Sequence, residues 1–244
     1  MTDCPEYYRK LDLHVHTPES VCYSDGEVSP ADIIDAALDA KLDAIAVTDH
    51  NSVNGIANLR EAAKNAELVI IPGVELTTKH GHFLALFEVD TPINEMDTFL
   101  DDVGLEKQGR GDAHTVTANK IDTVFQKIHD RGGIAIAAHI DRWPSGFLET
   151  KETRKRKQEI HENEYLDAIE ITIPKNRQAW RNGQIRGYPM KRACVQGSDA
   201  HNPAEIGRRP VYIKMGKIDL VGLRQALLNY GTDILFPEDV AECP

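Results

Sequence analysis

Residues 10–16 read Lys-Leu-Asp-Leu-His-Val-His, and this stretch decides how the rest of the chain is interpreted. Its apolar residues alternate with polar ones, and this period of two predicts a strand with one apolar face. His14 and His16 lie two positions apart, so both imidazoles point to the same side of the strand. Two histidines on one face of a rigid strand can bind one metal ion, although a surface strand can also carry such a pair by chance.

The composition is that of a globular protein, with 244 residues of which 41% are hydrophobic and 27% charged. We interpret residues 1–244 as one α/β domain, because neither a repeat nor a long linker divides them. No apolar run is long enough to span a bilayer, and we read no signal peptide at the amino terminus. The cysteines predict neither a disulfide framework nor a zinc ribbon, and they favour a reducing cytoplasm. They are scattered at Cys4, Cys22, Cys194 and Cys243.

The formal net charge of −11 bears on the class of partner. Binding to phosphate backbones needs clustered lysines and arginines, so nucleic acid is a less favoured partner than a small molecule. Acidic side chains are useful, in contrast, where they hold metal cations. The composition therefore favours a small substrate and metal ions, and it indicates no membrane partner.

Short apolar segments alternate with helical patterns along the chain. The core spans about residues 10–214, with insertions at about 88–114 and 141–165 that we expect to form the substrate pocket. The expected helices are about 30–41, 53–66, 116–131 and a closing helix at about 219–229. The expected strands are 10–16, 42–47, 68–76 (interrupted at Pro72-Gly73), 82–87, 134–138, 166–171, 193–196 and 209–214.

Strands that alternate with helices predict a parallel sheet. With about seven such units, a closed or nearly closed barrel is expected, and a doubly wound open sheet is the alternative. Metal-capable residues lie at or just past the carboxyl ends of the expected strands, which is the face that carries the active site in a βα barrel. These residues are His14, His16, His50, Glu75, His139, Asp199 and His201.

Histidines and carboxylates at one barrel mouth suit divalent zinc, iron or manganese. Two such ions about 3.5–4 Å apart would stabilise both the attacking and the leaving oxygen of a phosphoryl transfer. The sequence contains neither a Walker-type phosphate loop nor a Gly-x-Ser-x-Gly elbow. Nucleotide-driven and serine-hydrolase chemistry therefore have no support.

Several of these segments together resemble the ordered motifs of the polymerase-and-histidinol-phosphatase (PHP) family, over about residues 10–214. The resemblance implies a distorted (β/α)7 barrel with up to three metal ions at the carboxyl ends of its strands. It also implies phosphoesterase activity on histidinol phosphate, nucleotides or nucleic-acid ends. The motifs are LDLHVHT (11–17), AVTDHNS (46–52), IPGVEL (71–76) followed by GHFLALF (81–87), AIAAHID (135–141) and GSDAH (197–201).

Position by position, the resemblance implies three ion sites. Glu75 would bridge the first two ions, and a residue in the loop after the first strand would complete the third site. In the family that residue is a histidine or an aspartate. The implied ligands are His14, His16, Glu75 and Asp199 for the first ion, Glu75, His82 and His139 for the second, and His50 and His201 for the third.

The remaining ligand of the third ion has two candidates. Asp25, in Ser-Asp-Gly, is the natural one, and Glu19 is its rival because the loop is longer than the family's shortest version. At the second ion we prefer His82 to His80, because His82 begins a strand and aligns with the family ligand.

Two further carboxylates and three histidines lie outside this ligand set. We expect Asp49 to support a ligand histidine, and Glu170 to cap or pair at a strand end. His114, His129 and His161 have no motif context and are interpreted as solvated or structural.

The two N–H groups of an arginine fork bind two phosphate oxygens at once, so an arginine beside the ions would serve as a phosphate clamp. Arg142, three residues after His139, is the first choice and Arg177 the second, while Arg208 or Arg209 could also reach. The basic run 151–157 is interpreted as a solvated helical face, with a rim contact for a polyanionic substrate as the alternative.

The sequence therefore predicts a metal-dependent phosphoesterase that hydrolyses a small phosphorylated compound, such as a nucleotide or a histidinol-phosphate-like monoester. A hydroxide held between two ions would attack phosphorus in line. The expected cofactors are two or three divalent ions (Zn, Mn or Fe), and the expected catalytic residues are Glu75, Arg142 and Asp199. The alternatives are a nuclease acting on nucleic-acid ends, a non-catalytic PHP module, or the amino-terminal domain of a larger protein.

Overall fold

The computed structural model describes residues 7–144 and 146–240, so Cys4 and Cys243 lie outside the described residues. Within these ranges nine strands form one sheet in the order β7-β6-β5-β4-β3-β2-β1-β8-β9. The first seven strands follow one another in chain order, as in a barrel of β/α units. The strands are β1 (Tyr8–Val15), β2 (Ala44–Val47), β3 (Val69–Thr78), β4 (Gly81–Leu86), β5 (Ile134–Ala137), β6 (Ala168–Glu170), β7 (Ala193–Val195), β8 (Val211–Lys214) and β9 (Ile234–Leu235).

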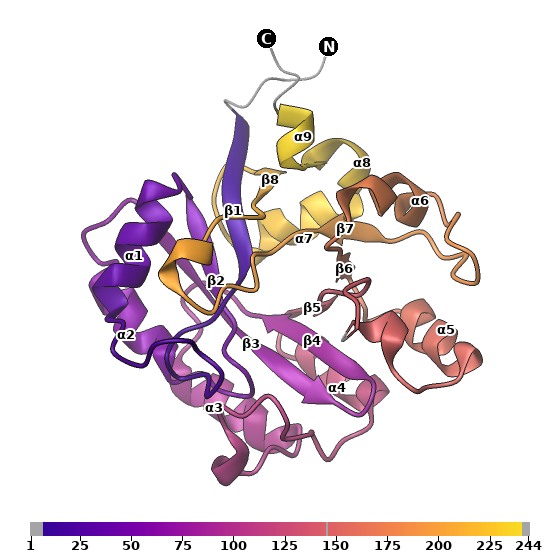
Figure 1. Ribbon diagram of the computed structural model, residues 1–244, viewed down its shortest axis with the longest axis horizontal. Helices are drawn as coiled ribbons and strands as arrows, with labels where there is room; N and C mark the ends of the chain where they lie inside the picture. Colours follow the sequence, from indigo (N-terminus) through magenta and orange to yellow (C-terminus); the bar gives the residue numbers. More distant parts are fainter. Residues whose placement is uncertain (1–6, 145, 241–244) are drawn as a thin grey trace.

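Helices surround this sheet on its outer side (Figure 1). The first begins with a capping box, in which the Ser29 and Asp32 side chains each bond the other's backbone N–H, and Pro30 stands at the first position. Among the described residues, no helix has both the length and the apolarity needed to cross a membrane. The helices are α1 (Pro30–Asp39), α2 (Gly55–Ala62), α3 (Ile93–Asp102), α4 (Ile121–His129), α5 (Arg154–Glu162), α6 (Arg177–Arg181), α7 (Leu220–Leu228), α8 (Tyr230–Asp233) and α9 (Pro237–Val240).

The sheet nearly closes where the segment after β7 meets β1. The Asp199 N–H donates to the His14 carbonyl at 2.8 Å, and the His16 N–H donates to the Ala200 carbonyl at 3.0 Å. A parallel bridge between Val15 and Ala200 continues this contact. The predicted nearly closed barrel is therefore confirmed, and its closure brings the last metal-capable motif beside the first.

The expectation of an all-parallel sheet is wrong at β4 and β8, and β9, which was not among the expected strands, is antiparallel as well. Strands β3 and β4 form an antiparallel hairpin whose two-residue turn holds Lys79 and His80. Because no helix separates these strands, the chain cannot cross over and must reverse. Strand β4 is also antiparallel to β5, while β8 runs antiparallel to both β1 and β9.

The expected interruption of the third strand is also wrong, because β3 is continuous through Pro72-Gly73. Up to Pro72 the strand pairs in parallel with β2, and from Gly73 it pairs antiparallel with β4. Proline has no N–H to donate, so it suits a point at which the strand changes partners. A Cβ at Gly73 would lie only 2.8 Å from Leu86 Cδ2, which explains why this close approach uses glycine.

Two segments depart from the expected pattern of loops and helices. Helix α4 begins five residues later than predicted, because the Thr117 and Ala118 N–H groups bond the Thr77 and Gly104 carbonyls instead of helical ones. The segment 141–165, expected as an insertion, contains α5 and connects β5 to the parallel strand β6. It therefore supplies an ordinary crossover helix of the barrel.

Helix α5 buries a histidine that the metal-capable motifs do not include. His161 is fully buried, and its ring lies 5.3 Å from Trp180 and 5.5 Å from Tyr188, centroid to centroid. Within the described part of the chain neither ring nitrogen has a hydrogen-bond partner. Burial, with a smaller contribution from Arg192, lowers the pKa of His161 to about 3. The expectation that His161 is structural is consistent with this packing.

This buried histidine predicts a defined loss of stability in acid. Between the unfolded pKa of about 6.5 and the folded pKa, only the unfolded chain binds the proton, so the free energy of unfolding falls as pH falls. We expect His161 alone to cost about 2 kcal/mol between pH 7 and pH 5. Urea unfolding of the metal-free protein at both pH values should show that His161→Phe loses correspondingly less stability than wild type. The exposed His114→Phe is the control, and equal losses in wild type and His161→Phe would contradict this assignment.

Candidate metal centre

The first strand of the barrel presents two buried imidazoles to one point. The Nε2 atoms of His14 and His16 lie 3.1 Å apart, and both side chains are fully buried. His14 lies in β1 and His16 directly follows the strand's last residue, Val15, and residues two apart along an extended segment share a face. The predicted pairing of these two histidines is therefore present in the fold.

Glu75 of β3 lies at the centre of the site, with imidazole nitrogens on both carboxylate oxygens. Its side chain is fully buried. Although burial opposes ionisation, the charge of His14, with a hydrogen bond from His139, holds the pKa of Glu75 well below its usual range. Oε2 lies 3.2 Å from His14 Nε2, 3.2 Å from His16 Nε2 and 3.0 Å from His50 Nδ1, while Oε1 lies 2.9 Å from His82 Nδ1 and 3.0 Å from His139 Nε2.

Asp199 reaches the same point from the segment that follows β7. Its Oδ1 atom lies 3.2 Å from His16 Nε2 and 3.4 Å from His14 Nε2. Asp199 has φ of 52° and His139 has φ of 31°, values that residues other than glycine seldom adopt. Such strained backbone concentrates at functional sites, where the surroundings hold it in place. Two of the candidate ligands are thus fixed by strained turns at strand ends.

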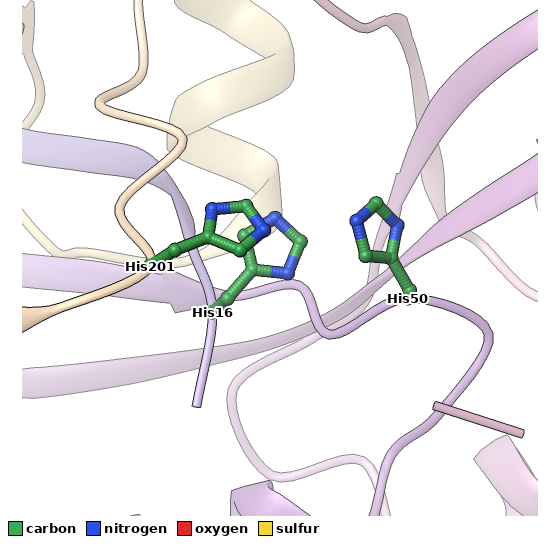
Figure 2. A group of neighbouring side chains, drawn as sticks. All are labelled: His16, His50 and His201. Carbon is green, nitrogen blue, oxygen red and sulfur yellow. The ribbon is translucent and has the colours of Figure 1, made fainter. Parts of the chain in front are cut away.

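A second group of histidines adjoins the first (Figure 2). The rings of His16 and His201 stack with centroids 4.1 Å apart, and the His50 ring lies 4.6 Å from His16. One nitrogen from each of these three residues lies within 4.8 Å of the other two. The two groups share His16, so the metal-capable side chains form one continuous cluster.

Glu170 of β6 orients two members of the cluster. Its Oε2 atom accepts hydrogen bonds at 2.9 Å from both the His14 Nδ1–H and the His139 backbone N–H. Glu170 therefore pairs at a strand end, as expected for it, and both of its partners belong to the cluster. The sequence carried a usable signal, because Glu170 ends the strand next to the one that precedes His139.

Asp49 supports the cluster from the other side, as expected for it. Its carboxylate accepts hydrogen bonds from the Thr17 N–H and hydroxyl and from the Ser20 hydroxyl, each at 2.7 Å. The Ser20 Oγ in turn lies 3.0 Å from His16 Nδ1. Ser20 and Thr17 were not among the predicted site residues, since nothing in their spacing distinguishes them from other loop residues.

Charge is distributed unevenly among the imidazoles. Although burial opposes the charged form, contacts with Asp199 and Glu75 raise the pKa of His16 to about 9. Burial lowers the pKa of His50 to about 3, despite the nearby Glu75. The metal-free cluster thus balances its two buried carboxylates with protons held on some histidines and not on others.

The side chains fit divalent metal ions. Glu75 Oε2 has no hydrogen-bond partner among the described residues, although three imidazole nitrogens lie within 3.2 Å of it. Nitrogens and oxygens that converge in this way are capable of binding a shared cation. Imidazole with carboxylate suits zinc, iron or manganese. Glu170 holds His14 and Ser20 holds His16, each through the ring nitrogen Nδ1. Histidines that bind metals in proteins are oriented by such hydrogen bonds to the other ring nitrogen.

The structure distinguishes among the remaining candidate metal ligands. His82 lies in the cluster, whereas His80 Nδ1 lies 3.1 Å from Glu152. Asp25 is exposed, and its carboxylate accepts the Glu27 N–H at 3.0 Å. None of the metal-capable groups among the described residues includes Asp25, Glu19 or Cys22, so none of the three loop residues lies within 4.8 Å of a whole group.

The two candidate clamp arginines have different surroundings. Arg142 Nη1 donates to Asp199 Oδ2, which places its guanidinium at the cluster. Arg177 instead donates to both carboxylate oxygens of Asp239 and lies 4.6 Å from the Phe236 ring centroid. The structure therefore brings Arg142 to the site and holds Arg177 in a separate ion pair.

Comparisons with known proteins give a consistent result. The model of the PHP domain family matches residues 12–174. The 5'-3' exoribonuclease of Haemophilus influenzae is 34% identical over 70 residues, which are 29% of this chain and 24% of that protein. A two-domain Bacteroides vulgatus protein, described as containing a predicted PHP-like metal-dependent phosphoesterase, aligns with a TM-score of 0.65 and 21% identity over 99% of this chain and 71% of its own.

A second solved structure extends the likeness in fold. The lesion-specific endonuclease Q of Pyrococcus furiosus aligns with a TM-score of 0.71 and 18% identity, over 94% of this chain and 57% of that one. At such identities the two solved structures support the fold alone. The chain spans about a quarter of the exoribonuclease and little more than half of the endonuclease.

The geometry predicts that Glu75 is required for metal binding. Elemental analysis after reconstitution with Mn, Zn or Fe should find two or three ions per wild-type chain, and fewer in Glu75→Gln. Metal at about a hundred times its dissociation constant should raise the free energy of unfolding of wild type by about 2.7 kcal/mol. The exposed Glu61→Gln is the control. Absence of bound metal in wild type with all three metals would contradict the assignment of this cluster.

Proposed function

Because the chain belongs to the PHP domain family, we propose that it is a metal-dependent phosphoesterase acting on a small phosphorylated compound, such as a nucleotide or a histidinol-phosphate-like monoester. The observation that carries this proposal is the buried Glu75 carboxylate, surrounded by imidazoles and open on one side to an arginine-lined cavity. Carboxylates and histidines would hold the ions, and arginine would hold the phosphate.

The cavity beside the cluster has a volume of about 360 Å³. Small-molecule sites in proteins commonly span about 300–1,000 Å³, so this volume suits a compact substrate. Two arginines line the cavity together with three candidate ligand histidines, and both carry the fork that matches a phosphate group. The lining residues are His50, His82, Arg142, Asp199, His201, Glu205 and Arg208.

Divalent ions, when bound at this cluster, would activate water and neutralise the charge that develops on the phosphoryl oxygens. The side chains of the chain supply orientation. Glu170 fixes the tautomer and direction of His14, and Ser20 does the same for His16. Arg142 would bind a phosphate oxygen through its guanidinium and hold the phosphorus atom over Glu75.

A nuclease that acts on nucleic-acid ends is the second candidate. The names of two similar proteins, an exoribonuclease and an endonuclease, favour it. The net charge of −11 argues against a long polyanionic substrate, because each phosphate contact needs a nearby cation. We therefore rank a small phosphomonoester first.

The order of these candidates can be tested with a substrate panel. We expect measurable hydrolysis of mononucleotides or of sugar or amino-alcohol phosphates, and weaker cleavage of long single-stranded RNA or DNA. Glu75→Ala serves as the matched inactive protein for every substrate, so that contaminating activity is subtracted. Robust cleavage of long strands with no hydrolysis of small monoesters would reverse the order.

The role of Arg142 can be separated from metal binding. Arg142→Ala removes the proposed clamp, which is worth roughly 1.5–3 kcal/mol, so kcat/KM should fall about ten- to a hundredfold. The metal content should stay at the wild-type value. Arg131→Ala is the control, because Arg131 pairs with Asp102 at the opposite end of the barrel. Full activity of Arg142→Ala on every substrate would refute the clamp.

A further inference from the structure

The loop after β1 is anchored at two points around a single cysteine. The Ser20 hydroxyl donates to Asp49 and accepts the His50 N–H at 3.1 Å. The Ser24 N–H and hydroxyl both donate to the His201 carbonyl, at 3.0 and 2.8 Å. Cys22 lies midway between these anchors, so the loop backbone holds it beside the histidine cluster.

The Cys22 side chain lies close enough to His201 for the two side chains to bind the same ion. Its Sγ atom lies 3.2 Å from His201 Nε2. A zinc ion bound by both atoms, at about 2.3 Å from sulfur and about 2.0–2.1 Å from nitrogen, would hold them roughly 3.5 Å apart in tetrahedral geometry. These two atoms would therefore need to move apart by only a few tenths of an ångström to share the ion.

A second observation at the same place points to an ion. His50 is buried, with only 6% of its side chain exposed, and its ring faces the stacked His16 and His201 rings (Figure 2). Its Nδ1 atom lies 3.0 Å from Glu75 Oε2, but it makes no hydrogen bond to any described residue. A buried imidazole without a hydrogen bond, aimed at two other imidazoles, is what a cation would satisfy.

We propose that Cys22, rather than Asp25, supplies the remaining ligand of a third ion held by His50 and His201, an inference that rests on the metal centre of the proposed function. The thiol would release its proton to solvent as the sulfur binds the ion. A thiolate ligand favours zinc over manganese or magnesium, whereas the aspartate expected from the sequence would not. The third site would therefore differ in metal preference from the sites around Glu75.

Cobalt substitution tests this ligand directly, since a thiolate bound to Co²⁺ gives a charge-transfer absorption band that imidazole and carboxylate ligands do not. We expect the band in the cobalt-loaded wild-type protein and its loss in Cys22→Ala and Cys22→Asp. The buried Cys194→Ala and the exposed Asp25→Asn are the controls, and both should retain it. A variant that lacks Cys4, Cys194 and Cys243 together should also retain the band.

Zinc titration provides a second readout that does not depend on turnover. Loss of a residue that only supports a metal ligand weakens metal binding roughly 10–100-fold. Cys22→Ala removes a ligand itself, so it should weaken the binding of one zinc ion by at least this factor. Cys22→Asp should recover part of the affinity. Loss of one ion in Asp25→Asn but not in Cys22→Ala would overturn the proposal, as would a wild-type cobalt spectrum without the thiolate band. Either result, with metal still bound around Glu75 and phosphoesterase activity intact, would leave the proposed function standing. Absence of all metal binding would refute both.

Discussion

The site depends on one buried charge, the carboxylate of Glu75. A carboxylate taken out of water costs several kcal/mol unless positive charge or hydrogen bonds offset that cost. The chain supplies five imidazoles around it, from β1 and the residue that follows it, from β4, and from the turns after β2 and β5. No two adjacent elements could do this alone. The near closure of the barrel is therefore a requirement of the site as much as of the hydrophobic core.

The departures from a regular parallel barrel also help to surround the Glu75 carboxylate with imidazoles. Because β3 changes partners at Pro72-Gly73, its second half is free to form a hairpin with β4. The hairpin register sets His82 opposite Thr77, so that the imidazole of His82 reaches Glu75 Oε1. A parallel strand reached through a crossover helix would have delivered that position from the opposite direction. The reversed strand is thus part of how the second proposed ion site is assembled.

Electrostatics connects the metal-free and metal-bound states of the cluster. In the metal-free cluster, protons on imidazoles balance the carboxylates, which is why the pKa of His16 is raised to about 9. Ions that bind here would displace those protons, so metal affinity must depend on pH. The supporting carboxylates Glu170 and Asp49 keep the rings oriented in either state, because their own partners are backbone N–H groups as well as side chains.

The sequence by itself determined the barrel class, the strand that carries His14 and His16, and most of the cluster that surrounds Glu75. It could do so because the period of two along β1 places both histidines on one face, and because parallel strands end at one edge of the sheet. Local pattern could not reveal the antiparallel β4, because a single apolar strand carries no mark of its direction. Only the tertiary structure decided which loop side chains reach the cluster. It brought Cys22 and Glu170 to it and left Asp25 in solvent, since the path of a loop depends on anchors such as Asp49 and the His201 carbonyl that are distant in sequence.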